Sequence, residues 1–281
     1  MSEVNIRDYI SQGISNLKQF KAILRQNLIR IPTNIITDEF AFSLAPEGWN
    51  FYRDLVFECS KKSEITLENT TFFQFFQSKQ LNSVCYLNDL LFIHDLERKN
   101  RLSHNGFNFY LGTYPWGGWT KEEASTGGKP FGHHYDRIEG KMTRDLWGYG
   151  RNPFYKPKDR HTLECELKVM QELYPSLKKG YYPLRYGFPS VTLLVRQNGE
   201  MRAVMGGGHH RLSILSHLGY ERLTVLLPES YMGKVFESEV AQWYYVSRGL
   251  CTPEQALEIF NAYFDLNGRE RLAYLGLTSI Y

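Results

Sequence analysis

Three glycines followed by two histidines and an arginine form the part of this 281-residue sequence with the clearest chemistry. The run is Gly206-Gly207-Gly208-His209-His210-Arg211, and it lies between an apolar stretch typical of a strand and an apolar pattern typical of a helix. A glycine turn that opens a helix directs several backbone N–H groups and the positive helix end toward one point, which favours phosphate. Glycine lets the chain approach the phosphate closely, and Arg211 can donate to its oxygens in a planar fork. A purely structural tight turn is the alternative interpretation.

A second polar cluster lies in a glycine-bounded stretch at residues 132–145. Its carboxylates could bind Mg²⁺ or the hydroxyl groups of a sugar, and its arginines could bind an anion. We therefore predict a substrate-recognition loop whose contacts come from His133, His134, Asp136, Arg137 and Glu139. An ordered surface loop with internal salt bridges explains the same residues equally well. Neither His-His pair is assigned to a metal, because sequence neighbours on a helix point in different directions and rarely chelate one ion together.

The elements before the glycine run are expected to be a helix and a hairpin. Apolar residues at helical spacing predict a helix over residues 162–174, which Pro175 should end. Two apolar stretches, 191–195 and 201–205, flank Asn198-Gly199. This pair favours a hairpin whose two central turn residues both have positive φ.

After the glycine run, apolar residues at Leu212, Leu215 and Leu218 predict a helix that Gly219 ends. A strand follows at residues 223–227, and the tail over residues 237–275 is expected to be helical. Within that tail, Thr252-Pro253 supplies an N-cap residue followed by a proline at the helix start.

The N-terminal part has weaker patterns. Residues 6–28 are predicted to form an amphipathic helix with a basic polar face, which packs on the domain or contacts an anionic membrane surface. Residues 33–105 are expected to be mixed helix without repeats. From Gly106 the sequence becomes rich in Gly, Trp and Tyr, which predicts a long functional loop as far as residue 155.

Composition narrows the function classes. The net charge is only +3, so DNA is not an expected partner unless a local basic patch exists. The four cysteines are widely separated and form no CxxC pair, so neither a zinc site nor a disulfide framework is expected. The chain shows no apolar run long enough to span a membrane and no leader pattern at its start, and a cytoplasmic location is expected.

The order of these elements resembles the ParB/sulfiredoxin superfamily over about 75 residues, 156–230. The resemblance rests on the segment Tyr174 to Leu184, the strand and hairpin, and the run Gly208-His209-His210-Arg211 before a helix. It implies a site for ATP, ADP or CTP in which the glycine run, His209, His210 and Arg211 contact the nucleotide. The Gly-His-His-Arg form is most similar to the branch of small-molecule kinases. Gly207 departs from that branch, which commonly has an aspartate there.

Two other branches fit less well. His209 occupies the position of the reactive cysteine of sulfiredoxins, so sulfinic-acid repair is not expected. The Glu-Arg-Arg form of partition proteins is absent, and no basic helix-turn-helix pattern follows the loop, so a DNA clamp is not expected either.

A kinase needs a group that accepts the proton of the attacking hydroxyl. The resemblance implies a carboxylate before or within the helix that precedes the hairpin, where Asp159, Glu164, Glu166 and Glu172 occur. We choose Glu164 as the catalytic base, with His210 and Arg211 stabilising the transferred phosphoryl group. Each of these carboxylates, taken alone, is more often a solvated helix charge than a catalytic base.

We therefore expect an α+β protein with four parts. These are a mainly helical accessory region (1–105), a loop region (106–155), a ParB/sulfiredoxin-like core (156–230) and a helical C-terminal cap (231–281). The expected function is an ATP-dependent kinase that uses Mg²⁺ and acts on a small hydroxylated molecule or a sugar unit. The alternative is a binding module that responds to CTP or ATP and acts on DNA or a protein partner without turnover.

Overall fold

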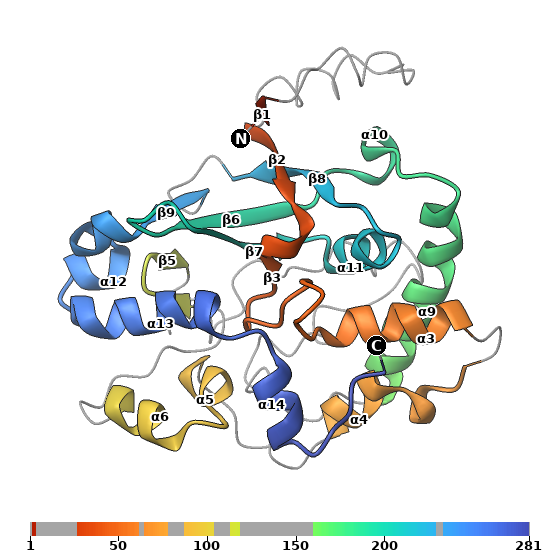
Figure 1. The fold of residues 1–281 in the computed structure, drawn as a ribbon, viewed down its shortest axis with the longest axis horizontal. Coiled ribbons are helices and arrows are strands. Elements are labelled where there is room, and N and C mark those ends of the chain that lie inside the picture. Colours follow the sequence, from red (N-terminus) through yellow and green to blue (C-terminus); the bar gives the residue numbers. More distant parts are fainter. Residues whose placement is uncertain are drawn as a thin grey trace.

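A computed structural model describes residues 2–3, 27–61, 65–77, 87–103, 113–118, 160–228 and 233–280. Within them the chain combines helices with a mixed β-sheet, which confirms the α+β class (Figure 1). The predicted substrate loop at 132–145 and residues 6–26 of the predicted first helix lie outside the described residues.

The central sheet takes strands from both ends of the chain. Its order is β1-β2-β8-β6-β7-β3, and β9 also pairs with β6. β6–β7 and β2–β8 are antiparallel, whereas β3–β7, β6–β8 and β6–β9 are parallel. The strands are β1 (Ser2–Glu3), β2 (Asn27–Pro32), β3 (Ile36–Thr37), β6 (Ser190–Val195), β7 (Met201–Gly207), β8 (Arg222–Leu227) and β9 (Lys234–Phe236).

Helices lie at both ends of this sheet and below it in the view of Figure 1. They are α3 (Phe51–Lys61), α4 (Thr71–Gln77), α5 (Leu87–Leu91), α6 (Leu96–Ser103), α9 (Arg160–Lys178), α10 (Pro183–Tyr186), α11 (His209–His217), α12 (Tyr244–Ser247), α13 (Pro253–Asp265) and α14 (Arg269–Tyr274). The described residues also include the short 3-10 helices η1 (Thr33–Ile35), η2 (Leu67–Asn69) and η4 (Glu237–Gln242). A separate hairpin consists of β4 (Thr113–Tyr114) and β5 (Gly117–Gly118).

Both faces of the central strands are buried. Val191 and Leu193 of β6 belong to one hydrophobic cluster, which also contains Leu212 and Leu215 of α11. Leu194, which points to the opposite face, belongs to a larger cluster with α3, α9 and α13. This second cluster holds many of the aromatic residues, as expected from their number.

Several expected elements are confirmed around the site. β6 and β7 form the hairpin, and α11 ends with Gly219 at a φ of +82°. Thr252 is the N-cap of α13 and forms a complete capping box, in which the Thr252 hydroxyl and the Gln255 side chain each accept a backbone N–H.

Three local predictions are wrong. Pro175 lies inside α9 instead of ending it, and Leu177 beyond it is 1% exposed, so burial offsets the missing helical hydrogen bond. Asn198 does not have the predicted positive φ, which in this turn occurs only at Gly199. The Gly199 N–H donates to Arg196 O, as in a longer hairpin loop that ends in a left-handed glycine. Residues 27–28 belong to β2 instead of a helix.

Candidate functional site

The glycine run connects β7 to α11. Gly206 and Gly207 are the last residues of the strand, and Gly208 is the N-cap of the helix with a φ of +83° and no side chain to cap the first turn. The first helical hydrogen bond runs from Leu212 N–H to Gly208 O, 2.9 Å apart. The amides of the preceding turn therefore have no helical carbonyl to bind, which is the arrangement of an anion site at a helix start.

His210, in the first turn of α11, contacts a buried carboxylate of another helix. Its Nε2 lies 2.5 Å from Oε2 of Glu166 on α9. The Glu166 side chain is 0% exposed, whereas that of His210 is 20% exposed. The Tyr52 ring of α3 packs edge-on against His210 with 4.7 Å between centroids, and its centroid lies 6.4 Å from that of His209. A buried carboxylate beside a partly exposed imidazole fixes the orientation of the imidazole.

Glu164, the base predicted from the sequence, lies elsewhere on α9. Its Oε1 is 2.6 Å from Nε of Arg160, and its side chain is 47% exposed. The described contacts do not bring it to His210. The sequence did contain a signal for Glu166, which follows Leu163 by three residues and precedes Met170 by four, so it lies on the apolar stripe of the helix. Tyr52 was missed because nothing in its local sequence relates it to the glycine run.

Arg211 contacts the segment that precedes β6. Its Nη1 donates to the carbonyls of Tyr186 and Gly187, the second at 2.7 Å. The same Gly187 carbonyl accepts the Tyr181 hydroxyl at 2.9 Å. Burial lowers the pKa of Arg211 from its usual value, although the group remains a cation. Both hydrogens of Nη1 are used by these carbonyls, whereas the hydrogens of Nη2 and Nε are not.

The glycines are close-packed around these groups. A Cβ on Gly208 would lie 2.8 Å from Nη2 of Arg211, and one on Gly187 would lie 3.1 Å from Nη1. A Cβ on Gly207 would lie 2.9 Å from the Ser190 hydroxyl, the mobile end of a side chain. Gly208 therefore allows the close approach of Arg211 to the loop.

The second predicted cluster is not part of the described structure. His133, His134, Asp136, Arg137 and Glu139 all lie outside the described residues. Within the described residues, no group of three or more His, Cys, Asp or Glu side chains could hold a metal ion. Likewise, no described helix is long and apolar enough to cross a membrane. Burial raises the pKa of Cys59 and of Cys251 to about 12, so these thiols are protonated at neutral pH.

Comparisons with known proteins gave no match to a family model, to a curated protein or to a solved structure. The resemblance to the ParB/sulfiredoxin superfamily therefore stays a prediction from the sequence. The function has to be argued from the residues around Gly208, His210 and Glu166.

Proposed function

We propose that the chain is an ATP-dependent phosphotransferase that acts on a small hydroxylated molecule or a sugar unit. The observation that carries this proposal is the contact between His210 and the buried Glu166 at the start of α11, directly after the glycine run. At this place a helix start that suits an anion lies beside a side chain that can accept a proton. Phosphoryl transfer needs both groups.

In the proposed reaction the nucleotide phosphates bind to the amides at the start of α11. Nη2 and Nε of Arg211 donate to the phosphate oxygens. Nδ1 of His210 accepts the acceptor's hydroxyl proton while the hydroxyl oxygen bonds to the γ-phosphorus. The bond between the γ-phosphorus and the β–γ bridging oxygen breaks, and ADP leaves. Glu166 stabilises the imidazolium that forms, in the way a buried carboxylate does beside other catalytic histidines.

Among the residues that the structure describes, no carboxylates around Gly208 and His210 are grouped to hold Mg²⁺. Because the described residues contain no metal-binding cluster, they do not fit a dedicated Mg²⁺ site. Mg²⁺ often reaches kinase sites with one or two carboxylates and the substrate phosphates as ligands, so it would arrive here as the nucleotide complex.

Two neighbouring glutamates provide a matched test. Glu166→Gln keeps the shape of the buried side chain but removes its charge, and Glu164→Gln makes the same change on the exposed face of α9. We expect Glu166→Gln to lower phosphoryl transfer from labelled ATP to a panel of polyols, sugars and hydroxy amino acids by about 10²–10⁴-fold. Glu164→Gln should leave the rate within about twofold. Equal losses in both variants would contradict the role of Glu166.

A nucleotide titration tests the binding half of the proposal separately. ATP, ADP, CTP and GTP should be titrated into the wild type and Arg211→Ala, with and without Mg²⁺. Saturable binding that weakens about tenfold or more in Arg211→Ala supports the loop as a nucleotide site. Absence of binding by all four would reduce it to a structural turn. Binding without transfer to any acceptor would instead favour the nucleotide-responsive binding module.

A further inference from the structure

A hollow of about 290 Å³ lies at the other end of β6 from the glycine run. β9 forms one of its walls and pairs with Leu193–Val195, whereas Ser190 at the opposite end of β6 pairs with Gly207. The β9 residues that line the hollow, Lys234 and Val235, pair with Leu193 and Leu194, three and four residues from Ser190, which corresponds to about 10–13 Å along the strand. Because β9 and β7 also flank opposite edges of β6, a small ligand here would lie apart from a phosphate bound at α11. The volume is close to the lower limit of about 300 Å³ for small-molecule pockets.

The inner wall of the hollow is aromatic. Trp116 and Trp243 line it, and each is at least 95% buried, with 4% and 5% of its surface exposed. Their rings pack edge-to-face, 5.7 Å between centroids, and the Trp243 indole N–H donates to Phe236 O at 3.2 Å. Tyr245 N–H donates to Pro115 O at 3.0 Å, which ties the β4–β5 hairpin to α12. The wall is therefore fixed from several elements before any ligand binds.

The rim carries charged side chains that are not neutralised by each other. Lys234, Glu239 and Arg248 line the hollow, and none of them takes part in an ion pair within the described residues. The Arg248 guanidinium lies 3.7 Å from the centroid of the Tyr244 ring and donates to Tyr244 O at 3.3 Å. This stacking holds one cation in place at the rim, which reduces the entropy lost when an anion binds.

We propose that this hollow binds a sugar acid, a small ring compound that carries hydroxyl groups and a carboxylate. The two cations, Lys234 and Arg248, match the carboxylate, and Glu239 can accept ligand hydroxyls. The apolar face of a sugar ring matches the apolar part of the lining, which consists of Val235, the Tyr244 ring and the small exposed parts of the two indoles. The proposal is independent of phosphoryl transfer at the glycine run.

Calorimetric titration of D-glucuronate into the full-length chain tests the proposal, with D-glucose and acetate as probes for the two halves of the ligand. We expect saturable binding of glucuronate and at least tenfold weaker binding of glucose and of acetate. Lys234→Gln/Arg248→Gln should weaken glucuronate binding at least tenfold, and Glu239→Gln should weaken it several-fold. Arg101→Gln/Lys168→Gln removes the same charge at exposed positions elsewhere and should change nothing.

Trp243→Phe provides a second measurement, because it keeps an aromatic wall but removes one of the two indoles. The change in tryptophan fluorescence on adding glucuronate should be strongly reduced in this variant. Three results would overturn the proposal. They are no binding of glucuronate, equal affinity for glucose or acetate, and unchanged affinity in the Lys234→Gln/Arg248→Gln variant.

Discussion

The backbone turns at Gly208 from the end of β7 into α11 with a φ of +83°, a conformation that costs an L-residue about 1 kcal/mol or more. A Cβ there would also lie 3.2 Å from Pro189 Cα and 2.8 Å from the Arg211 guanidinium. We expect Gly208→Ala to lower the free energy of unfolding by about 2 kcal/mol. Urea denaturation followed by circular dichroism measures this loss.

Gly206→Ala is the matched control for that prediction. Gly206 lies in β7 without a positive φ, and a Cβ on it would meet the Ser190 hydroxyl at 3.4 Å, an ordinary contact distance. We expect a change in stability of at most about 0.5 kcal/mol. Equal losses in the two variants would show that backbone conformation is not what requires glycine at position 208.

The two glutamates of α9 show what sequence reasoning can decide at this scale. Glu164 and Glu166 have the same chemistry, and a sequence search for a base finds both. Only the phase of the helix separates them, since Glu166 lies on the stripe with Leu163 and Met170 while Glu164 faces solvent. The partner of Glu166 is His210, 44 residues later, and no local pattern relates these positions.

Among the elements, α10 depends on Arg211 for its place beside the glycine run. Arg211 donates to the carbonyls of Tyr186 and Gly187. The Tyr186 hydroxyl also lies 2.6 Å from the hydroxyl of Ser176 on α9. The Tyr181 ring stacks on Tyr186 at 6.2 Å between centroids. Because α10 has only four residues, these tertiary contacts must supply most of its stability.

Arg211→Lys should therefore loosen residues 181–187 even though it keeps the charge. A lysine ammonium is a single group on a flexible stem and lacks the planar guanidinium that fixes Nη1 between the two carbonyls. We expect the amides of Tyr186 and Gly187 to exchange hydrogen about 5–10-fold faster, as the loss of about 1 kcal/mol of local stability requires. Hydrogen–deuterium exchange mass spectrometry measures this, and Lys179→Gln, an exposed neighbour, should leave the rates unchanged. Unchanged exchange in Arg211→Lys would contradict the role of Arg211 in holding α10.

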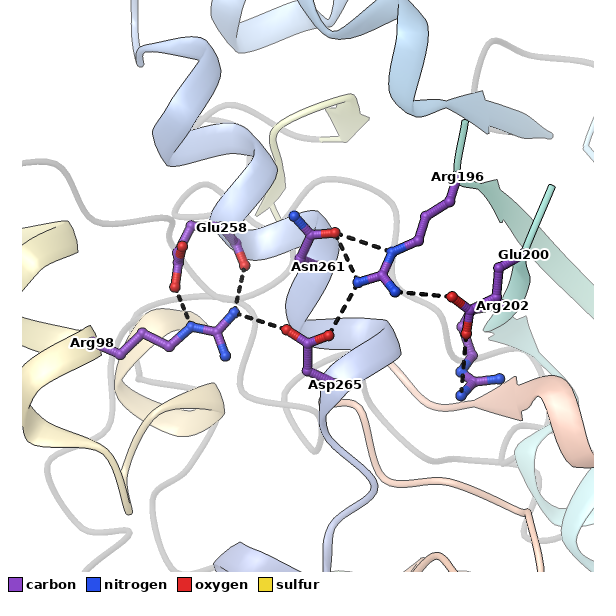
Figure 2. Close-up of polar contacts among 7 residues, drawn as sticks. All are labelled: Arg98, Arg196, Glu200, Arg202, Glu258, Asn261 and Asp265. Atoms are coloured by element: carbon purple, nitrogen blue, oxygen red, sulfur yellow. Dashed lines mark hydrogen bonds and ion pairs between the residues drawn. The ribbon is translucent and has the colours of Figure 1, made fainter. Parts of the chain in front are cut away.

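A network of charges joins α6 and α13 to the β6–β7 hairpin (Figure 2). Asp265 of α13 accepts Nη2 of Arg196 at 3.0 Å and Nη2 of Arg98 at 3.4 Å. Arg196 also donates to Asn261 and Glu200, and its guanidinium stacks 4.2 Å from the Phe264 ring centroid. The Asp265 side chain is about half exposed, so solvent weakens the attraction within each ion pair. The Asp265 carboxylate nevertheless pairs with two arginines at once.

Asp265→Asn should lower the free energy of unfolding by about 1 kcal/mol, and high salt should reduce the difference from wild type. Denaturation in urea at low and high ionic strength measures both effects. Glu97→Gln removes an exposed pair with Arg101, in which the side chains are 85% and 61% exposed, and should cost almost nothing. If the two variants behave alike, the network adds nothing beyond isolated surface pairs.

The hairpin and the helices near the glycine run were predictable because their signals are local. Asn198-Gly199, the apolar spacing of α11 and the Thr252 cap all act within a few residues. The strands β2 and β3 were not predictable in the same way. Their hydrogen-bond partners are β8 and β7, about 170–200 residues later, and the sequence of β2 fits a helical pattern as well.

Across the whole molecule, the C-terminal helices bind a buried turn near the N-terminal strands. Arg271 of α14, 1% exposed, donates to the carbonyls of Phe40 and Ala41, and the Tyr263 hydroxyl of α13 donates to Glu39 O at 2.7 Å. The turn itself forms around Asp38, whose Oδ1 accepts the N–H groups of Phe40 and Phe42 at 2.9 Å. Both ends of the chain therefore share one polar core, which the division of the sequence into successive regions did not anticipate.

Two buried carboxyl groups in this core predict a pH-dependent stability. Burial raises the pKa of Asp38 to about 7, despite hydrogen bonds from the Phe40 and Phe42 amides and from Asn50. Burial also raises the pKa of Asp54 to about 6, although Trp49 and Ser279 donate to it. A carboxyl group with a higher pKa in the folded state holds its proton more tightly there, so protonation favours folding. This contribution is complete below about pH 4 and is lost as the pH rises through about 6 and 7.

The variants Asp38→Asn and Asp54→Asn isolate these effects, because an amide cannot ionise. Relative to Asp38→Asn, the wild type should lose a few kcal/mol of unfolding free energy as the pH rises from about 5 to about 7, and the difference should level off above pH 7. Relative to Asp54→Asn, the loss over this range should be smaller and should level off about one pH unit lower. Burial lowers the pKa of His94 and of His217, which gives the opposite dependence, but these groups are common to all three proteins and cancel in the differences. Urea denaturation at intervals of half a pH unit measures the curves. A difference between wild type and Asp38→Asn that does not vary with pH would mean that Asp38 is ionised throughout, held as an ion by Arg271 and its three hydrogen bonds.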